Sequence, residues 1–438
     1  MAILSKEEAK GIMEKVLSYS RADQCIVTIY GNERGNIRYA RNTVSTSGAE
    51  SNVDLVVESS YGKKSGIATI NEFDEESLKK VVKRSEELAK LAPENPEFVE
   101  ALGPQVYKES KQAFKSTEEI TPEYRAQVAA SSINQAAENG LVAAGFFEDS
   151  VDFAGMMNSK GLFAYEKSTD VSFTLTVRTK DGSGSGWVSR DFNDVSKFDA
   201  AKASSIAVKK AASSKEAKAL EPGKYTVILE PAASVGLLGN MARNLGARPA
   251  DEGRSFLSKK GGGNKLGEKL FDERVNVYSD PLHPEIPYST WSNNGLPRER
   301  IEWIKNGVVK NLYYSRYWAK EKGVDPVPFP GRFIMEGGNQ SLEELIKGTK
   351  KGILVTRLWY IRSVDPQTLL YTGLTRDGTF YIENGEIKYP IKNFRFNESP
   401  VIMLNNLEAL GKPQRIDGSL IPPMKIRDFT FTSLSDAV

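Results

Sequence analysis

Histidine and cysteine are almost absent from this chain of 438 residues, which has one of each, His283 and Cys25. A hydrolytic zinc site needs about three protein ligands and an open position for water, with a carboxylate as general base. A serine or cysteine hydrolase would have to use His283 as its base, and the sequence has no G-x-S-x-G nucleophile elbow. We therefore expect His283, which three prolines surround, to be structural, and Cys25 to be a small core residue.

The chain also lacks long apolar runs and an excess of charge of either sign, and its first residues are not expected to form a secretory leader. No uncharged apolar run is long enough to cross a bilayer, and the N-terminus has no apolar leader core. The net charge is +2, from 59 basic and 57 acidic residues whose signs are interleaved. Interleaved signs are typical of solvated helix faces rather than of a nucleic-acid footprint. With the single cysteine, these absences predict a cytoplasmic protein that binds neither membrane nor nucleic acid.

The most informative segment, residues 225–255, predicts a strand, a helix and a turn. Residues 225–230 have the β-branched and apolar density of a buried strand, and Pro231 suits the first turn of a helix. We expect that helix over residues 232–245, with Gly246 as its stop. Its apolar stripe comprises Val235, Leu237, Leu238, Met241, Ala242 and Leu245. Gly236 and Gly239 each cost about 1 kcal/mol in a helix interior, which indicates a close approach to the backbone or tight helix–sheet packing.

Three parts of this segment resemble the TldD/PmbA family: Val-Ile-Leu-Glu-Pro (227–231), Gly-Leu-Leu-Gly-Asn-Met-Ala-Arg-Asn (236–244) and Gly-Arg-Ser-Phe (253–256). In the TldD-like members, this helix carries a His-Glu-x-x-x-His zinc motif. The resemblance places the motif positions on Gly239, Asn240 and Asn244, and none of these is the residue type that the chemistry needs. The late cysteine ligand of the family is missing too. The resemblance therefore implies the TldE/PmbA-like branch, with no metal, no cofactor and no catalytic residue in this chain.

The fold class that the sequence predicts is α+β, because strands come as hairpins with interspersed helices rather than as repeated βα units. Glu-Pro-Gly at 221–223 marks the expected boundary between an N-terminal α+β domain (1–220) and a C-terminal strand-rich domain with one central helix (221–438). Residues 25–30 and 36–41 are expected to pair as one hairpin, and residues 53–58 and 64–70 as another. A four-stranded meander is expected over residues 141–148, 151–158, 161–166 and 170–179, and the proline-rich residues 91–104 should be an extended connector.

In the C-terminal half, two Asn-Gly pairs, at 306–307 and 384–385, each predict a tight hairpin. Residues 352–362 predict a strand with Arg357 and Trp359 on one face and Leu358 and Tyr360 on the other. Together with 341–344 and 372–378, these segments extend the resemblance over most of residues 222–412. It implies a cytoplasmic dimer with an enclosed interior and a part in the proteolysis of unfolded or modified peptides. The older family name, modulator of DNA gyrase, implies a genetic link that nothing in this sequence explains.

Two functions remain open at this point. In the first, the chain is a non-catalytic subunit, in a homo- or heterodimer, that positions peptide for a TldD-like HExxxH metalloprotease. An open β edge or groove would hold the peptide, and Arg357, Trp359, Tyr360 and Arg376 are candidates for contacting it; packing within the strand is the alternative for each. In the second, the chain is a stand-alone hydrolase of unrecognised mechanism. Asp251-Glu252 and Asp272-Glu273 could supply carboxylates, which suit Mg or Ca better than zinc and are usually just solvated in polar loops.

Overall fold

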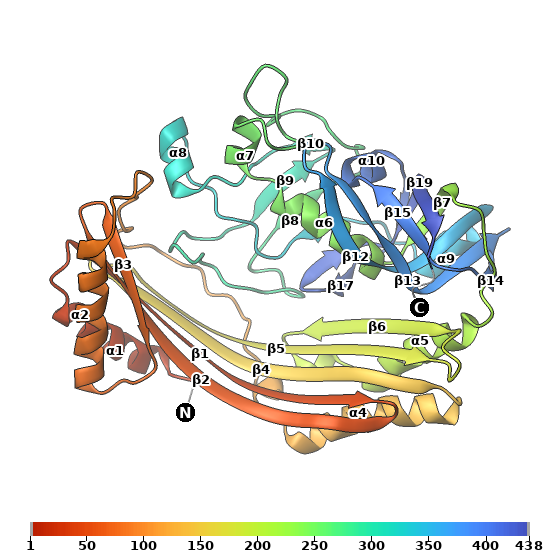
Figure 1. Ribbon diagram of the computed structural model, residues 1–438, viewed down its shortest axis with the longest axis horizontal. Helices are drawn as coiled ribbons and strands as arrows, with labels where there is room; N and C mark the ends of the chain where they lie inside the picture. Colours follow the sequence, from red (N-terminus) through yellow and green to blue (C-terminus); the bar gives the residue numbers. More distant parts are fainter. Residues whose placement is uncertain (1–2, 436–438) are drawn as a thin grey trace.

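The structure, a computed structural model that describes residues 3–435, is a mixed α+β protein with three sheets (Figure 1). The N-terminal sheet is antiparallel, with strand order β3-β2-β1-β4-β5-β6. Its strands are β1 (Gln24–Ala40), β2 (Thr43–Tyr61), β3 (Lys64–Ile70), β4 (Val142–Asn158), β5 (Phe163–Arg178) and β6 (Ser185–Phe192). The α+β class predicted from the hairpin pattern is confirmed.

The strands of this sheet are longer than the sequence predicted. Residues 25–30 and 36–41 do not form a hairpin, because both belong to the single strand β1, and its hairpin partner is β2. Likewise, the four-stranded meander is two long strands, β4 and β5. The polar middle of β1 stays extended because β2 pairs with it on one side and β4 on the other. The predicted hairpin between residues 53–58 and 64–70 is confirmed as β2–β3.

Helices cover the sheet at both ends. They are α1 (Lys6–Tyr19), α2 (Glu75–Leu91), the short α3 (Lys115–Glu118), α4 (Pro122–Glu138) and α5 (Ala200–Ser213). The first two pack on one apolar cluster, in which Cys25 is buried as expected, and α4 and α5 pack on another. Figure 1 shows the sheet curving beneath the C-terminal region with α4 on its outer face. Between α2 and α3, the connector crosses toward the C-terminal region without a regular element, as the prolines predicted.

Five C-terminal strands close into a ring through the pairings β12–β7, β7–β19, β19–β15, β15–β13 and β13–β12. They are β7 (Gly223–Leu229), β12 (Lys351–Asp365), β13 (Leu370–Glu383), β15 (Phe394–Glu398) and β19 (Met424–Leu434), with β14 (Glu386–Pro390) and β16 (Leu407–Leu410) attached. Phe394, Phe396, Phe429 and Phe431 are buried and in ring contact: Phe394 and Phe431 stack, and Phe429 meets both Phe396 and Phe431 at a tilt. Within the ring, each strand pairs on both sides, so the paired segments have no free edge. We therefore expect the ring to hold the attached segments rigidly.

A third sheet of short strands adjoins the ring, in the order β10-β9-β8-β11-β18-β17. Its strands are β8 (Val277–Ser279), β9 (Ile301–Lys305), β10 (Val308–Val309), β11 (Ile334–Met335), β17 (Gln414–Ile416) and β18 (Ser419–Ile421). The remaining helices are α6 (Pro231–Arg243), α7 (Ala247–Asp251), α8 (Arg316–Lys322), α9 (Leu342–Lys347) and α10 (Pro400–Asn405). Both Asn-Gly hairpins are confirmed, as β9–β10 and β13–β14, with positive φ at all four residues. The division at residue 220 stays a prediction.

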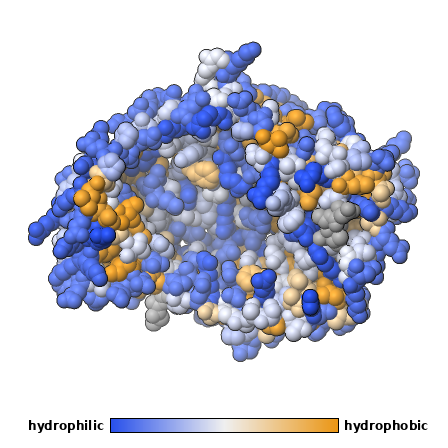
Figure 2. All heavy atoms as spheres, in the orientation of Figure 1, coloured by the Kyte–Doolittle hydropathy of each residue, from blue (hydrophilic) through white to orange (hydrophobic). Residues whose placement is uncertain are grey.

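The surface in this orientation is largely hydrophilic, and it is hollowed between the N-terminal sheet and the C-terminal region (Figure 2). None of the helices within residues 3–435 is long and apolar enough to cross a membrane.

Candidate functional site

The central helix α6 is the part of the chain that the sequence singled out, and most of its predicted features are present. It begins at Pro231, and the whole predicted apolar stripe is buried. The predicted stop is wrong, because the helix ends at Arg243 with Asn244 as its cap, and Gly246 has φ −82° and begins α7 instead. A capping residue with φ −97° already turns the chain, so no left-handed glycine is needed.

The two glycines of α6 have different surroundings. A Cβ atom on Gly236 would lie 2.7 Å from Cδ1 of Ile361 on β12, so the helix and the strand are in tight contact there. A Cβ atom on Gly239 would meet nothing nearer than 3.8 Å, the distance to Nη1 of Arg243. Tight helix–sheet packing therefore explains Gly236, whereas Gly239 has room for a side chain.

The three motif positions carry no set of donors that fits zinc. Gly239 has no side chain, and the Oδ1 atom of Asn240 accepts a hydrogen bond of 2.7 Å from Nη2 of Arg243. The Nδ2 atom of Asn244 donates to the Asn240 carbonyl at 2.8 Å and faces the Tyr371 hydroxyl at 3.5 Å. Zinc takes thiolate, imidazole or carboxylate ligands, and a guanidinium beside the site opposes a cation. Across residues 3–435, no group of three or more His, Cys, Asp and Glu side chains could hold a metal ion.

The sole histidine lies in the loop between β8 and β9. The Nδ1 atom of His283 accepts a hydrogen bond of 3.3 Å from the backbone of Glu285, which orders the proline-rich turn. Burial lowers the pKa of His283, so the imidazole is neutral near pH 7. These contacts fit the structural role that its sequence surroundings predicted.

An arm formed by residues 356–376, the parts of β12 and β13 beyond the pairing of β12 with β7, lies against α6, and its β13 side pairs with β15 at residues 371–374. Its side chains include the exposed Trp359 and Tyr360, whose solvent-exposed fractions are 39% and 55%. The predicted alternation of faces fails there, because Tyr360 has φ 55° and the register shifts between Trp359 and Arg362. As a result the two rings are neighbours, with centroids 5.3 Å apart.

The two candidate arginines have different environments, although Arg357 and Arg376 face each other across the ladder. The Arg376 guanidinium lies 4.1 Å from the Trp359 ring centroid, within the exposed cluster. That of Arg357 lies over Trp187 of β6, and its Nε is 2.7 Å from the Oδ2 atom of Asp377. Burial lowers the pKa of Arg357, and the Asp377 charge opposes that shift. Arg357 therefore fixes the arm to the N-terminal sheet, while Trp359, Tyr360 and Arg376 form one cluster.

Sequence reasoning missed Asp377, which connects the two halves of the chain. Its carboxylate is fully buried and accepts a hydrogen bond of 2.5 Å from the Ser185 hydroxyl, 192 positions away in the sequence. Its φ of 57° precedes a second positive φ, 116°, at Gly378. An Asp-Gly pair within a strand pattern was the signal that could have marked this irregular point.

The arm offers a backbone edge as well as side chains. Strand β7 pairs with β12 only at residues 353–355, and β13 occupies the other side of β12. Among the strands of the described part of the chain, none pairs with the outer side of β12 from residue 356 to residue 365. An extended peptide could therefore add to this edge by backbone hydrogen bonds.

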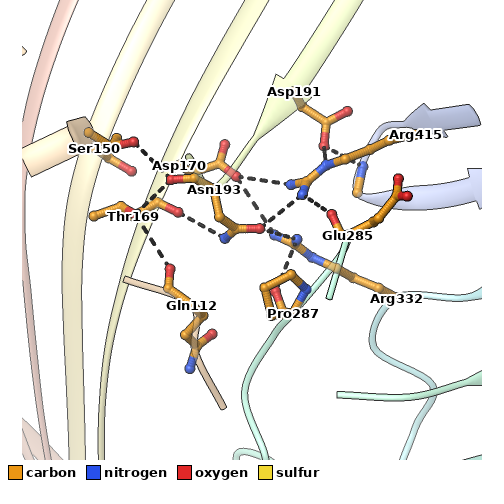
Figure 3. A network of polar contacts seen from close by, with 12 residues as sticks. Gln112, Ser150, Thr169, Asp170, Asp191, Asn193, Glu285, Pro287, Arg332 and Arg415 are labelled. Atoms are coloured by element: carbon orange, nitrogen blue, oxygen red, sulfur yellow. Dashed lines mark hydrogen bonds and ion pairs between the residues drawn. The ribbon is translucent and has the colours of Figure 1, made fainter. Parts of the chain in front are cut away.

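A polar network joins the N-terminal sheet to the C-terminal half of the chain (Figure 3). The Nε atom of Arg415 lies 2.8 Å from Oδ2 of Asp191, and Arg415 and Arg332 both donate to Oδ1 of Asn193, at 3.0 and 3.2 Å. Asp170 lies 3.7 Å from Arg332 and 3.8 Å from Arg415. Burial raises the pKa of Asp170 to about 7, against the opposing effect of the two arginines. The network holds β17 and the loop before β11 against β5 and β6.

Family models for three consecutive domains match the chain: PmbA/TldA metallopeptidase domain 1 over residues 27–89, the central domain over 107–215 and the C-terminal domain over 222–433. The chain belongs to the TldD/PmbA family. The resemblance read from α6 and the Asn-Gly hairpins is thereby confirmed. Membership of the family accounts for the architecture of this chain. Whether the chain can bind a catalytic metal depends on the residues at the motif positions of α6, Gly239, Asn240 and Asn244.

Individual relatives agree with this placement. An uncharacterised protein of Methanocaldococcus jannaschii is 26% identical over 371 residues, covering 80% of this chain and 83% of the relative. Metalloprotease PmbA of Escherichia coli O157:H7 is 23% identical over 46% of each chain. The crystal structure of TldE from Thermococcus kodakarensis superimposes with a TM-score of 0.86, at 20% identity, over 96% of this chain and all of that one. At that identity, the likeness to TldE shows the fold alone.

Proposed function

We propose that this chain is the TldE/PmbA-like, non-catalytic subunit of a cytoplasmic TldD/TldE-type protease, which binds unfolded or modified peptide for a TldD-like HExxxH partner. The observation that carries the proposal is one juxtaposition. Helix α6 keeps its buried stripe but has Gly239, Asn240 and Asn244 at the motif positions, and an arm with an unpaired edge lies against it. A scaffold that keeps its binding edge without metal ligands suits substrate positioning better than hydrolysis.

Binding alone can accelerate a reaction on the partner. A peptide held in a near-attack geometry loses its orientational freedom before the chemical step, which lowers the barrier of that step. The free edge of β12 would fix the peptide backbone, and Trp359, Tyr360 and Arg376 would contact side chains of varied sequence. Aromatic and arginine side chains supply large contact areas, so they frequently dominate binding energies.

The proposal is tested by assaying an unfolded peptide with this chain, with a TldD-like partner, and with both. We expect hydrolysis only in the mixture, or a marked rise in the partner's turnover when this chain is added. Equal turnover by the partner with and without this chain would defeat the proposal, as would turnover by this chain alone.

A matched pair of variants locates the peptide site. Trp359→Ala should weaken peptide binding by this chain about tenfold, because an exposed aromatic anchor is typically worth about 1–2 kcal/mol. Ile387→Ala is the control, since Ile387 is comparably exposed, at 46%, on the distant strand β14. Binding measured by fluorescence anisotropy should be lowered by the first change and unaffected by the second. The same loss in both variants would remove the arm from the site.

A further inference from the structure

The arm carries a row of side chains in which two guanidinium groups flank two aromatic rings. The Arg376 guanidinium lies 4.1 Å from the centroid of the Trp359 ring, and the centroids of the Trp359 and Tyr360 rings are 5.3 Å apart. The Arg362 guanidinium in turn lies 4.4 Å from the centroid of the Tyr360 ring. We call these four side chains the arginine–aromatic row. Three of them belong to the segment of β12 whose outer side pairs with none of the described strands.

The arm has more guanidinium groups than carboxylates to neutralise them. Asp377, at the base of the arm, is fully buried and has its Oδ2 atom 2.7 Å from Nε of Arg357 and 3.8 Å from Nε of Arg376. One carboxylate is thus shared by two arginines. Arg362, at the other end of the row, forms no ion pair with any acidic residue in the described part of the chain. The row therefore has a positive charge that the chain itself does not neutralise.

The single acidic residue of the arm, Asp365, does not offset this charge. Its carboxylate accepts hydrogen bonds within its own turn, from the Thr368 hydroxyl at 2.6 Å and from the Gln367 backbone at 2.9 Å. Arg243, exposed in the last turn of α6, adds a further positive charge, and its Nη2 atom donates to Asn240 rather than to a carboxylate. The free edge of β12 is therefore flanked by basic groups, which attract acidic ligands.

We propose that the arginine–aromatic row makes this edge selective for acidic peptides, in which Asp or Glu residues flank an apolar residue. The inference rests on the peptide-binding role proposed above and adds the chemistry of the peptide. Guanidinium groups match the geometry of carboxylates and bind them through two parallel hydrogen bonds. Between the two arginines, the Trp359 and Tyr360 rings would contact the apolar side chain. Charge complementarity of this kind determines which partner is bound more than it determines total affinity.

An added strand would present side chains in a pattern that suits the row. In an extended chain, alternate side chains project to the same face, so residues two and four positions apart are aligned. A Glu-x-Leu-x-Glu segment would thus present two carboxylates and one apolar group on one face, while its backbone pairs with β12. Because Tyr360 has φ 55°, its ring lies beside that of Trp359, and both rings are exposed. One bound strand would therefore engage the edge and the row together.

Single-stranded nucleic acid is the other class of ligand that arginine and aromatic side chains bind. The edge of β12 favours a peptide, because its backbone donors and acceptors match another peptide strand and not a sugar–phosphate chain. The net charge of the chain is also only +2, with basic and acidic residues interleaved, whereas nucleic-acid-binding domains have an extended basic surface. A thymidine oligonucleotide is therefore the competitor in the test.

The test measures the binding of three labelled peptides to the full chain by fluorescence anisotropy. The probes are Ser-Glu-Ser-Leu-Ser-Glu-Ser and the same peptide with both Glu residues replaced by Gln or by Lys. We expect the Glu peptide to bind about tenfold more tightly than the Gln peptide, as two partly exposed ion pairs would provide, and the Lys peptide to bind most weakly. The preference should decrease as the ionic strength is raised to about 0.5 M, because salt screens exposed charges.

Arginine variants show whether the row causes the preference. Arg362→Gln should lower the preference for Glu over Gln to about threefold, and adding Arg376→Gln should abolish it, while the affinity for the Gln peptide changes little. Arg362→Lys should retain part of the preference, since it keeps the charge without the planar guanidinium. Arg84→Gln is the matched control, because Arg84 is 64% exposed on α2, outside the arm, and its loss should leave the preference unchanged. Unfolding midpoints close to that of the wild type would show that the variants are folded, and Arg362→Gln alone decides the question if the double variant unfolds.

The outcomes separate this inference from the peptide-binding role itself. Equal binding of the Glu and Gln peptides would overturn the acidic preference, and weaker binding of both by Trp359→Ala would then leave the peptide site in place. If none of the three peptides bound, the peptide-binding role and this inference would both fail. A preference that survived Arg362→Gln, or that Arg84→Gln lowered equally, would contradict the role of the row. Displacement of the Glu peptide by the oligonucleotide at a lower concentration than by unlabelled Glu peptide would identify nucleic acid as the occupant and overturn the proposal.

Discussion

The ring of C-terminal strands and the N-terminal sheet manage their edges in opposite ways. The ring closes through five pairings around a cluster of buried phenylalanines, and the outer side of β12 in its arm pairs with no strand of residues 3–435. The N-terminal sheet is open, and residues 43–54 of β2 pair with β1 on one side and with no strand of the described chain on the other. Closure concentrates stability in the ring, while unpaired edges lie where the chain could bind another backbone. In this molecule, the candidate peptide-binding surface is such an edge.

The two regions should differ most in how much free energy of unfolding is lost when a side chain is removed. Phe431→Ala should lower the free energy of unfolding by about 3–5 kcal/mol, because Phe431 is 2% exposed and packs on three aromatic rings. Val44→Ala on the free edge, where Val44 is 46% exposed, should change it by less than about 0.5 kcal/mol. Chemical denaturation of both variants makes the measurement. Similar losses would mean that the edge is as well packed as the ring.

The open sheet has one place where a single replacement should cost nearly as much. Arg125 of α4 holds Asp149 of β4 through two hydrogen bonds of 2.6 and 2.8 Å, and both side chains are about nine-tenths buried. Arg125→Ala would leave a buried carboxylate without its partner, so we expect a loss of about 3 kcal/mol. Lys10→Ala, which removes an exposed pair with Glu14, is the control and should change stability by less than about 0.5 kcal/mol. If Arg125→Ala lowered stability as little as Lys10→Ala, the buried Arg125–Asp149 pair would not stabilise the open sheet as proposed.

The sequence predicted local features well and long-range ones poorly. The α6 stripe, the Asn-Gly hairpins and the β2–β3 hairpin depend on residues near one another in the chain, and these predictions are confirmed. The continuity of β1 through its polar middle depends on β2 and β4, which no local pattern contains. Ring closure likewise requires the order of five strands spread over about 200 residues.

At the candidate site too, local features could be predicted from the sequence and long-range contacts could not. The motif positions Gly239, Asn240 and Asn244 were found from the helix sequence itself. The contact between Gly236 and Ile361, and the burial of Asp377 against Ser185, join segments more than 100 residues apart. Tyr360 departed from the predicted face because a positive φ interrupts β12, and the two-residue period cannot anticipate such a break.

The smallest expected effect lies at the junction of the two regions. Asp170 has its pKa raised to about 7 by burial, while Arg332 and Arg415 oppose the rise and the Asp191 and Asp152 charges add to it. A carboxyl with a raised folded-state pKa binds more protons when folded. Its contribution to stability is therefore complete below pH 4 and is lost as the pH rises through about 7. Because 40% of the Asp170 side chain is exposed, solvent screens the charge, and we expect on the order of 1 kcal/mol between pH 5 and pH 8.

Asp170→Asn should remove this part of the pH dependence, because an amide does not titrate and can still accept from either arginine. Unfolding free energies at pH 5 and pH 8 should therefore differ less in the variant than in the wild type. Asp181→Asn is the control: hydrogen bonds from Thr179 and Ser183 lower the pKa of Asp181 to about 2, outside this range, so its loss should leave the difference unchanged. If Asp170→Asn retained the full wild-type difference, the carboxylate at the junction would be titrating in the acidic range. The two arginines would then outweigh its burial, and the junction would stabilise the ionised form.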